Sequence, residues 1–146
     1  MKVDIVWFKR DFRLEDHAPI NAVATSNNDF LGIFIIEPSR LREQDTDPIH
    51  VDWEIKCAVE LQSRIRKLGG EMLILHDEVI NAFEKLKTKY LISNVYSHEE
   101  IGTEWSYQRD IKFGKWCKTN NLNWKEFPTN AVVRRLYNRD NWYKLR

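Results

Sequence analysis

The stretch that follows the first apolar run combines residues that bind anions with residues that hold such groups in place. It reads "KRDFRLEDH", from Lys9 to His17, and it includes Arg10 and Arg13 among three acidic side chains. An arginine can make two parallel hydrogen bonds to a carboxylate or a phosphate, and neighbouring carboxylates can orient it. The same charges also suit solvated surface ion pairs, which contribute little. The residues alone therefore leave two readings, a ligand-binding loop and a plain surface loop.

A second group of candidate residues lies in "SHEEIGTEW", from Ser97 to Trp105. Thr103 is a suitable N-cap for a helix, and Glu104 in the first turn complements the helix dipole. Glu99 and Glu100 precede that turn, and their carboxylates could accept hydrogen bonds from a heterocycle. They could equally serve only the start of the helix, so binding and capping both remain open.

Several other chemistries lack the residue patterns that they need. Neither GxGxxG nor GxxxxGK[ST] occurs, and the loop after the first strand contains no glycine, which argues against a tight phosphate cradle. We predict no catalytic nucleophile, because no Ser or Cys lies in a recognisable turn beside a His. Metal-binding spacing is also missing, so we predict no metal site from the scattered His17, His50, His76 and His98 and two buried thiols at Cys57 and Cys117.

Composition places the chain among single globular domains. It has 146 residues, of which 42% are hydrophobic, and its 23 basic residues nearly balance 22 acidic ones. Such a balance gives no overall field for nucleic acid, which argues against a free-standing DNA-binding protein. No apolar run is long enough to cross a membrane and no leader precedes the first strand, so we expect a cytoplasmic protein without a membrane partner.

The candidate residues must be positioned by elements that alternate along the chain. Strand-like apolar runs occur at residues 3–8, 30–36, 72–75, 90–96 and 122–127. Helical spacing occurs between them at residues 19–25, 51–68, 77–89 and 103–118, the second with Val51, Ile55, Ala58, Val59, Ile65 and Leu68 on one face. Gly69 and Gly70 suit a helix C-cap, and Asp77 is placed to cap the next helix.

This alternation predicts a three-layer α/β fold of the Rossmann-like, doubly wound type, with helices on both faces of a five-stranded parallel sheet in the order 3-2-1-4-5. In such sheets ligands bind beyond the carboxyl ends of the strands, near the point where the strand order reverses. The loops to consider are therefore residues 9–17, 37–49, 76–78 and 97–104.

Taken together, these segments resemble the N-terminal part of the DNA photolyase and cryptochrome family. "VWFKRDFRLEDHAPINAV" fits that family's pattern W-[FH]-[RK]-x-[DG]-[LF]-R-x-x-D-[NH] from Trp7 to His17. "SHEEIGTEWSYQRD" is similar to the segment after strand four and ends in the family's Arg-Asp pair at Arg109 and Asp110. "FPTNAVVRRLYNRDNW" looks like the stretch that leads towards the next domain. The resemblance extends over nearly the whole chain.

The resemblance implies a light-harvesting domain of a larger flavoprotein. Residues 1–128 would form the antenna-chromophore domain and residues 129–146 the start of an interdomain linker, with the FAD-binding helical domain absent. The full-length family enzyme is a carbon-carbon lyase that repairs pyrimidine dimers in DNA by blue-light-driven electron transfer from FAD. Its helical domain and, through that domain, damaged DNA would be the partners, and we expect no repair by this chain alone.

The family's antenna pocket is built from the loops after strands one, two and four. The resemblance therefore implies chromophore contacts at Phe8, Lys9, Arg10, Glu37, Pro38, Gln44, Glu99, Glu100 and Glu104. Folate-binding relatives have a histidine and an asparagine near the positions of Gln44 and Asp45, and both differ here. We therefore expect a flavin or a deazaflavin rather than folate, bound weakly or not at all in the absence of the helical domain.

Alternative readings lead to different functions for the same fold. The full-length protein could be a cryptochrome, a blue-light receptor, because the discriminating residues would surround the FAD. The chain could also be a free-standing flavin or nucleotide-binding module, or a scaffold with an empty pocket. In the basic last segment, the residues alone leave open whether Arg134 and Arg135 contact DNA, a partner domain or solvent.

Overall fold

Five parallel strands form the centre of the computed structural model, which describes residues 2–129 and 137–144. Their order is β3-β2-β1-β4-β5, as the sequence predicts. The strands are β1 (Lys2–Phe8), β2 (Asp29–Ile36), β3 (Glu71–His76), β4 (Leu91–His98) and β5 (Asn123–Phe127). The order reverses between β1 and β4, so the loops after these two strands begin side by side at the carboxyl edge of the sheet.

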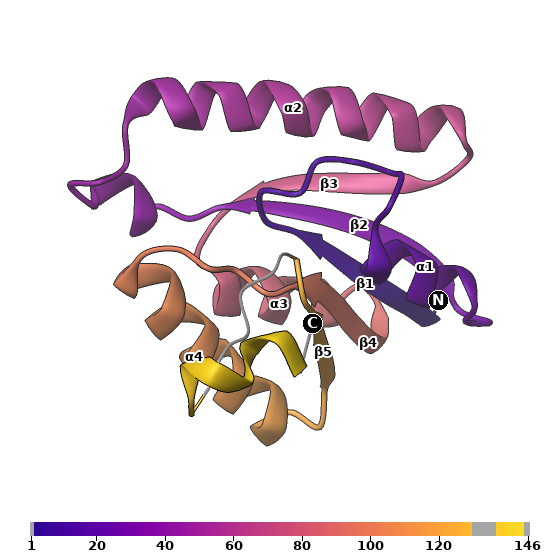
Figure 1. Cartoon of the computed structure of the whole chain (residues 1–146). Coiled ribbons are helices and arrows are strands. Elements are labelled where there is room, and N and C mark those ends of the chain that lie inside the picture. Colours follow the sequence, from indigo (N-terminus) through magenta and orange to yellow (C-terminus); the bar gives the residue numbers. More distant parts are fainter. Residues whose placement is uncertain (1, 130–136, 145–146) are drawn as a thin grey trace.

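Helices cover both faces of this sheet (Figure 1). On one face lie α1 (Ala18–Ala24) and α2 (Pro48–Lys67), and on the other lie α3 (Val79–Lys87) and α4 (Glu104–Thr119). Each face has its own apolar core, and together they bury strands from both sides, as expected of parallel sheets. The predicted three-layer fold is confirmed.

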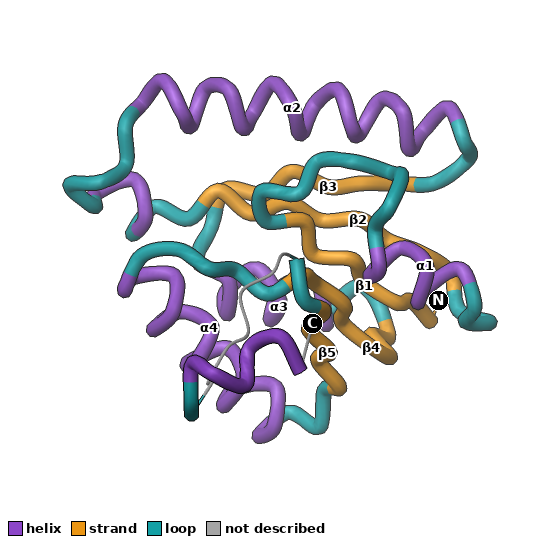
Figure 2. The backbone as a smooth tube through the Cα atoms, viewed as in Figure 1, coloured by secondary structure: helices purple, strands orange, loops and turns teal. Residues whose placement is uncertain are grey.

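Alternation along β1 divides the side chains between the two cores. Ile5 and Trp7 pack on the side of α3 and α4, whereas Val6 and Phe8 pack on the side of α1 and α2. After β1 the chain crosses in front of β2 and β3, below α2, before it enters α1 (Figure 2). There Phe12 packs edge-on against Phe34, with ring centroids 4.9 Å apart. The charged loop is thus tied to the core by its own apolar residues.

The predicted helix ends agree with the structure in two of three places. Gly69 has φ +84°, a left-handed conformation that favours glycine, and its N–H donates to the carbonyl of Arg66 after α2 ends. Thr103 caps α4 by accepting a hydrogen bond from the N–H of Ser106. The prediction for Asp77 is wrong by one residue. Helix α3 begins at Val79 after Glu78, and the Asp77 carboxylate accepts from the Glu78 N–H instead.

The predicted buried face of α2 is correct only in part. The predicted Ala58 and Ile65 are buried against the sheet, as is Leu61, which the prediction omits, but Val59 is 51% exposed and Leu68 is 78% exposed. Val59 follows Ala58 directly and so points about 100° away around the helix, while Leu68 lies beyond the last helical residue. The contact stripe of this helix is therefore narrower than its apolar composition indicates.

Two short helical segments occur where the sequence predicts no regular structure. A 3-10 helix at Arg40–Arg42 interrupts the loop after β2, and another at Arg139–Lys144 lies within the predicted linker. Arg134 and Arg135, which the sequence also singles out, fall outside the described residues. Cys57 and Cys117 are both free thiols; Cys117 is buried as predicted, whereas Cys57, on α2, is only partly buried. Among the residues that the structure describes, no helix has the length and apolar character of a membrane span.

Candidate functional site

Arg109 of α4 joins three of the predicted loops at the carboxyl edge of the sheet. Its guanidinium donates hydrogen bonds to Glu37 after β2, at 3.0 Å, and to Glu100 after β4. It also donates to the neighbouring Asp110, and it lies over the Trp7 ring at 4.9 Å from the centroid. Burial alone would lower the pKa of Arg109, but the attraction of Glu100, Asp110 and Glu37 outweighs it, so the pKa lies above its usual value.

Glu37 connects this cluster to the start of α3. One oxygen accepts from Arg109, and the other accepts from the N–H of Val79 at 3.2 Å. Because the Glu78 side chain makes no capping bond, Glu37 caps α3 from the loop after β2. Burial raises the pKa of Glu37, and the nearby Arg109 opposes that rise. The side chain is 2% exposed, which makes it a structural part of the edge.

Lys9, the first residue of the charged loop, is also buried. Its ammonium group lies 3.1 Å from an oxygen of Asp110 and 3.7 Å from one of Glu126, and it stands over the Trp7 ring. Burial lowers the pKa of Lys9, and the charge of Asp110 partly opposes this. Lys9 therefore fixes the beginning of the loop to α4 and β5.

Asp11 brings together two histidines that are far apart in the sequence. One of its oxygens, Oδ2, lies 2.8 Å from Nε2 of His17 and 2.6 Å from Nδ1 of His98, and the other accepts from the Lys9 N–H at 2.8 Å. All three side chains are buried. Burial would raise the pKa of Asp11, but the hydrogen bonds from His17 and His98 outweigh it and hold the pKa below its usual range.

This Asp-His-His cluster has the ligand types of a metal site. Its three possible ligand atoms also lie within 4.8 Å of one another. Its hydrogen bonds favour another arrangement. Nδ1 of His17 accepts the Ile20 N–H at 3.3 Å, so the proton of that ring is on Nε2 and points to Asp11. A metal on Nε2 would need that nitrogen unprotonated and would break the cap of α1. We interpret the cluster as a hydrogen-bonded unit.

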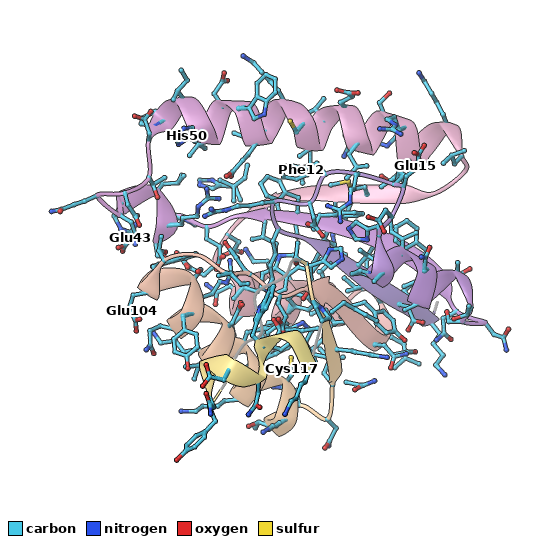
Figure 3. All side chains as sticks on the ribbon, viewed as in Figure 1. Phe12, Glu15, Glu43, His50, Glu104 and Cys117 are labelled. Atoms are coloured by element: carbon cyan, nitrogen blue, oxygen red, sulfur yellow. The ribbon has the colours of Figure 1, made fainter. Side chains whose placement is uncertain are left out.

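Two pockets open beside these clusters and share Arg10. The first has a volume of about 150 Å³ and lies between the loop after β2 and the start of α2; it is lined by Arg10, Arg40, Glu43, Asp45, Thr46, Asp47, His50, Glu54 and Thr103. The second, of about 170 Å³, lies between the loops after β1 and β4; it is lined by Lys9, Arg10, Asp11, Arg13, His98, Glu99, Glu100, Ile101 and Thr129. Figure 3 shows Glu43, His50 and Glu104 at the same end of the molecule, where α2 and α4 begin.

Arg10 is the exposed cation between the two pockets. Its Nε lies 3.8 Å from Glu54 in one and 3.4 Å from Glu100 in the other, and its side chain is 47% exposed. Arg40 is held more tightly, because both of its terminal nitrogens donate to Glu54 at 2.7 Å. Arg10 therefore has more freedom than Arg40 to turn towards a ligand.

A third pocket, of about 400 Å³, lies on the α3 and α4 side of the edge. Its lining includes Val79, Ile80 and Trp105, with Arg109 and Lys112 beside them. Trp105 is held there by a hydrogen bond from its indole N–H to the Ser39 hydroxyl at 3.2 Å. This pocket is less polar than the two that share Arg10, and it lies away from the point where the strand order reverses.

The structure brings only some of the predicted contact residues to one place. Lys9, Arg10, Glu99 and Glu100 line the second pocket, and Glu37 lines the third. Phe8 is completely buried in the core beneath α1 and α2 and has no surface to offer a ligand. The remaining predicted residues, which line none of the three pockets, are the half-buried Pro38 and the exposed Gln44 and Glu104.

Sequence reasoning missed several residues that build this edge. His17 and His98 are far apart in the sequence and lack metal-ligand spacing on a helix, yet β1 and β4 are adjacent and bring them together. Arg40 and Glu54 were also missed. The one available signal was that His17 ends the charged loop and His98 ends a predicted strand at the same edge of the sheet.

A family model and curated relatives both relate the chain to photolyases and cryptochromes. The family model described as DNA photolyase matches residues 4–136. A deoxyribodipyrimidine photo-lyase of Synechococcus sp. is 27% identical over 97 residues, which are 66% of this chain and 20% of that protein. A chloroplastic/mitochondrial cryptochrome DASH of Solanum lycopersicum is 25% identical over 137 residues, which are 90% of this chain and 23% of that protein.

Solved structures show the same likeness. The photolyase of the archaeon Sulfolobus tokodaii, whose crystal structure contains two FAD molecules, superimposes with a TM-score of 0.76 and 25% identity. The match covers 98% of this chain and 34% of that one. The chain thus spans about a fifth of the curated relatives named above and about a third of this solved relative.

Proposed function

Because the chain belongs to the DNA photolyase family, as an N-terminal α/β domain of the photolyase and cryptochrome type, we propose that it is the light-harvesting domain of a photolyase-like flavoprotein. In the proposed full-length protein, a helical domain binds FAD and repairs pyrimidine dimers in DNA under blue light. Residues 129–146 lead towards that domain, and no residue of this chain is catalytic. A cryptochrome of the same architecture is the alternative.

One observation carries the proposal for this chain. Two polar pockets meet at Arg10, at the edge where the strand order reverses, which is where open α/β sheets bind ligands. Each has roughly the volume that holds one aromatic ring. Both are lined by arginine donors and carboxylate acceptors, which suit the polar edges of a heterocycle. This donor set fits a flavin or a deazaflavin.

The residues divide into contacts and supports. We assign direct contacts to Arg10, Glu99 and Glu100, with Lys9 and Asp11 forming the wall behind them. Arg109 and Glu37 hold the loops after β2 and β4 at a fixed separation. A bound flavin or deazaflavin would supply absorption of blue light and pass excitation energy to FAD. The protein's part is to orient the ring and to exclude water from its buried edge.

A spectroscopic titration tests this proposal. The purified chain is titrated with FMN, a deazaflavin and a folate, and absorption and fluorescence are followed. We expect a saturable spectral change with FMN or the deazaflavin, and about a tenfold weaker affinity for Arg10→Ala, since a charge-assisted hydrogen bond is lost. The matched control is Arg66→Ala, an exposed arginine at the far end of α2.

The outcomes separate the alternatives. Saturable binding that Arg10→Ala weakens and Arg66→Ala leaves unchanged supports the antenna role. If none of the three compounds changes its spectrum in the presence of the wild-type chain, the proposal fails. The alternative that the domain is a scaffold with an empty pocket is then favoured. Light-dependent repair of dimers by this chain alone would contradict the assignment of catalysis to the helical domain.

A further inference from the structure

His98 differs from the other buried polar residues of this edge in having one ring nitrogen committed and the other available. It is the last residue of β4, and its side chain is 5% exposed. Nδ1 lies 2.6 Å from Oδ2 of Asp11. An ionised carboxylate only accepts hydrogen bonds, so the proton of the neutral His98 ring is on Nδ1 and the lone pair is on Nε2.

The rest of the cluster fixes this arrangement. Asp11 also accepts from Nε2 of His17 and from the Lys9 N–H, so both of its oxygens are engaged and the carboxylate cannot rotate without breaking bonds. His17 cannot exchange roles with His98, because its own Nδ1 accepts the Ile20 N–H at the start of α1. Such a partner on one ring nitrogen determines what the other nitrogen can do.

His98 forms part of the wall of a pocket, where its Nε2 could accept a hydrogen bond from a ligand. His98 lines the second pocket together with Arg10, Arg13 and Glu100. Within residues 2–129 and 137–144, no hydrogen bond to Nε2 is present, although the ring is nearly buried. Among the described residues, the fully buried side-chain atoms without a partner are Asp4 Oδ2 and Ser93 Oγ, so Nε2 of His98 retains accessible surface, and His98 lines this pocket. The cluster thus places an acceptor at a cavity whose other lining residues are charged, apart from Ile101 and Thr129.

We propose that the second pocket is a ligand subsite in which Nε2 of His98 accepts a hydrogen bond from a ring N–H or a hydroxyl of the ligand, with Asp11 as the positioning residue. The ligand class is a neutral heterocycle that carries an N–H beside a carbonyl, because His98 offers the acceptor and Arg10 the neighbouring donor. The pocket volume of about 170 Å³ accommodates one such ring. This inference rests on the proposed function, since the ring would be the polar end of the bound chromophore.

Two substitutions separate the binding role of His98 from its structural role. In His98→Asn, the side-chain amide nitrogen takes the place of Nδ1 and still donates to Asp11, but nothing remains at Nε2. In His98→Gln, a carboxamide reaches the position of Nε2, but the bond to Asp11 is lost. The exposed His76, at the end of β3, gives the matched control His76→Asn.

The test measures riboflavin affinity and thermal stability of the full chain. We expect His98→Asn to bind riboflavin about tenfold more weakly with little loss of stability, because one buried hydrogen bond to the ligand is removed. His98→Gln should lose stability and retain more of the affinity than His98→Asn, and His76→Asn should behave as wild type. Equal affinity of wild type and His98→Asn would overturn the inference and leave the proposed function standing.

The tautomer gives a readout that does not depend on stability. Nitrogen NMR of the wild-type imidazoles should show a protonated Nδ1 and an unprotonated Nε2 for His98, with the Nε2 signal shifting when riboflavin is added. The opposite tautomer, or a signal that riboflavin leaves unchanged while it binds, would overturn the inference. If riboflavin does not bind the wild-type chain at all, the proposed function and this inference both fail.

Discussion

Charged residues at the carboxyl edge of the sheet and on the outer surface of α2 are alike in type but differ in what they do. Arg109 is 10% exposed and faces Glu37, Glu100 and Asp110 from three parts of the chain. Arg66 is 53% exposed, and among the described residues it meets one carboxylate, that of the half-exposed Glu71, besides a long contact of 3.4 Å to the Gln62 side chain. Burial and the number of partners, rather than charge itself, separate structural ion pairs from solvated ones.

Arg10 belongs to neither group, and this difference supports a ligand-binding role. It lies at the buried edge, yet its side chain is about half exposed, and its nearest carboxylate contacts are longer than those of Arg40 or Arg109. A residue that only stabilised the fold would be expected to be as tightly held as its neighbours. The comparison therefore distinguishes supporting charges from the charge that faces the pockets.

The largest expected effect is that of Arg109→Met. Removal of the guanidinium leaves three carboxylates close together and largely buried, which should cost about 3–5 kcal/mol of the free energy of unfolding. Urea denaturation at neutral pH measures it, with Arg66→Met as the control, expected to lose at most about 1 kcal/mol. Similar losses in the two variants would remove the distinction between buried and exposed pairs.

A smaller effect is expected for Asp11→Asn, and it should depend on pH. The pKa of Asp11 is lower in the folded chain than its unfolded value of about 4, because the hydrogen bonds from His17 and His98 outweigh burial. Its ionised form therefore stabilises the fold above about pH 4, and this contribution is lost as the pH falls through the folded-state pKa.

Measurement of unfolding at several pH values checks this expectation. At neutral pH, Asp11→Asn should lose about 1–3 kcal/mol relative to wild type, and the difference should narrow as the pH is lowered towards 2. A difference that is independent of pH would mean that the carboxylate charge contributes nothing to the cluster.

The smallest effect is expected for Lys56→Ala on α2. Lys56 forms an exposed i,i+4 pair with Asp52, and such pairs contribute about 0.5 kcal/mol or less. Thermal unfolding at low and high salt is the measurement, and the small loss should decrease further in high salt. A loss comparable to that of Asp11→Asn would contradict the contrast between the surface and the edge.

The order of strands and helices could be predicted from the sequence because it depends on local periodicity. Runs such as those at residues 30–36 and 72–75 match β2 and β3, whose side chains pack against both cores, more deeply buried in β2 than in the edge strand β3. The position of the site at the carboxyl edge of the sheet could also be predicted, because parallel strands place the loops that follow them at the same edge. The exact first residue of α3 could not be predicted from the local sequence, because the residue that caps this helix, Glu37, lies in a loop that is distant in the sequence.

The candidate site could be predicted only in outline. The charged loop and the acidic segment at residues 99–100 were identified, but side-chain roles depend on contacts across the sheet. The family resemblance implies a ligand contact at Phe8, whereas the alternation of β1 directs this side chain into the core. Asp11 and His98 are 87 residues apart, and their contact arises only once β1 and β4 are paired.

The central claim is that a heterocycle binds where the two pockets meet at Arg10. Backbone amide NMR of the isotope-labelled chain, with riboflavin added in steps, tests the location directly. We expect the shifting amides to fall within residues 9–13, 43–47 and 98–103, on the loops that line these pockets. Shifts concentrated instead around Ile80 and Trp105, in the pocket between α3 and α4, or no shifts at any residue, would contradict the account.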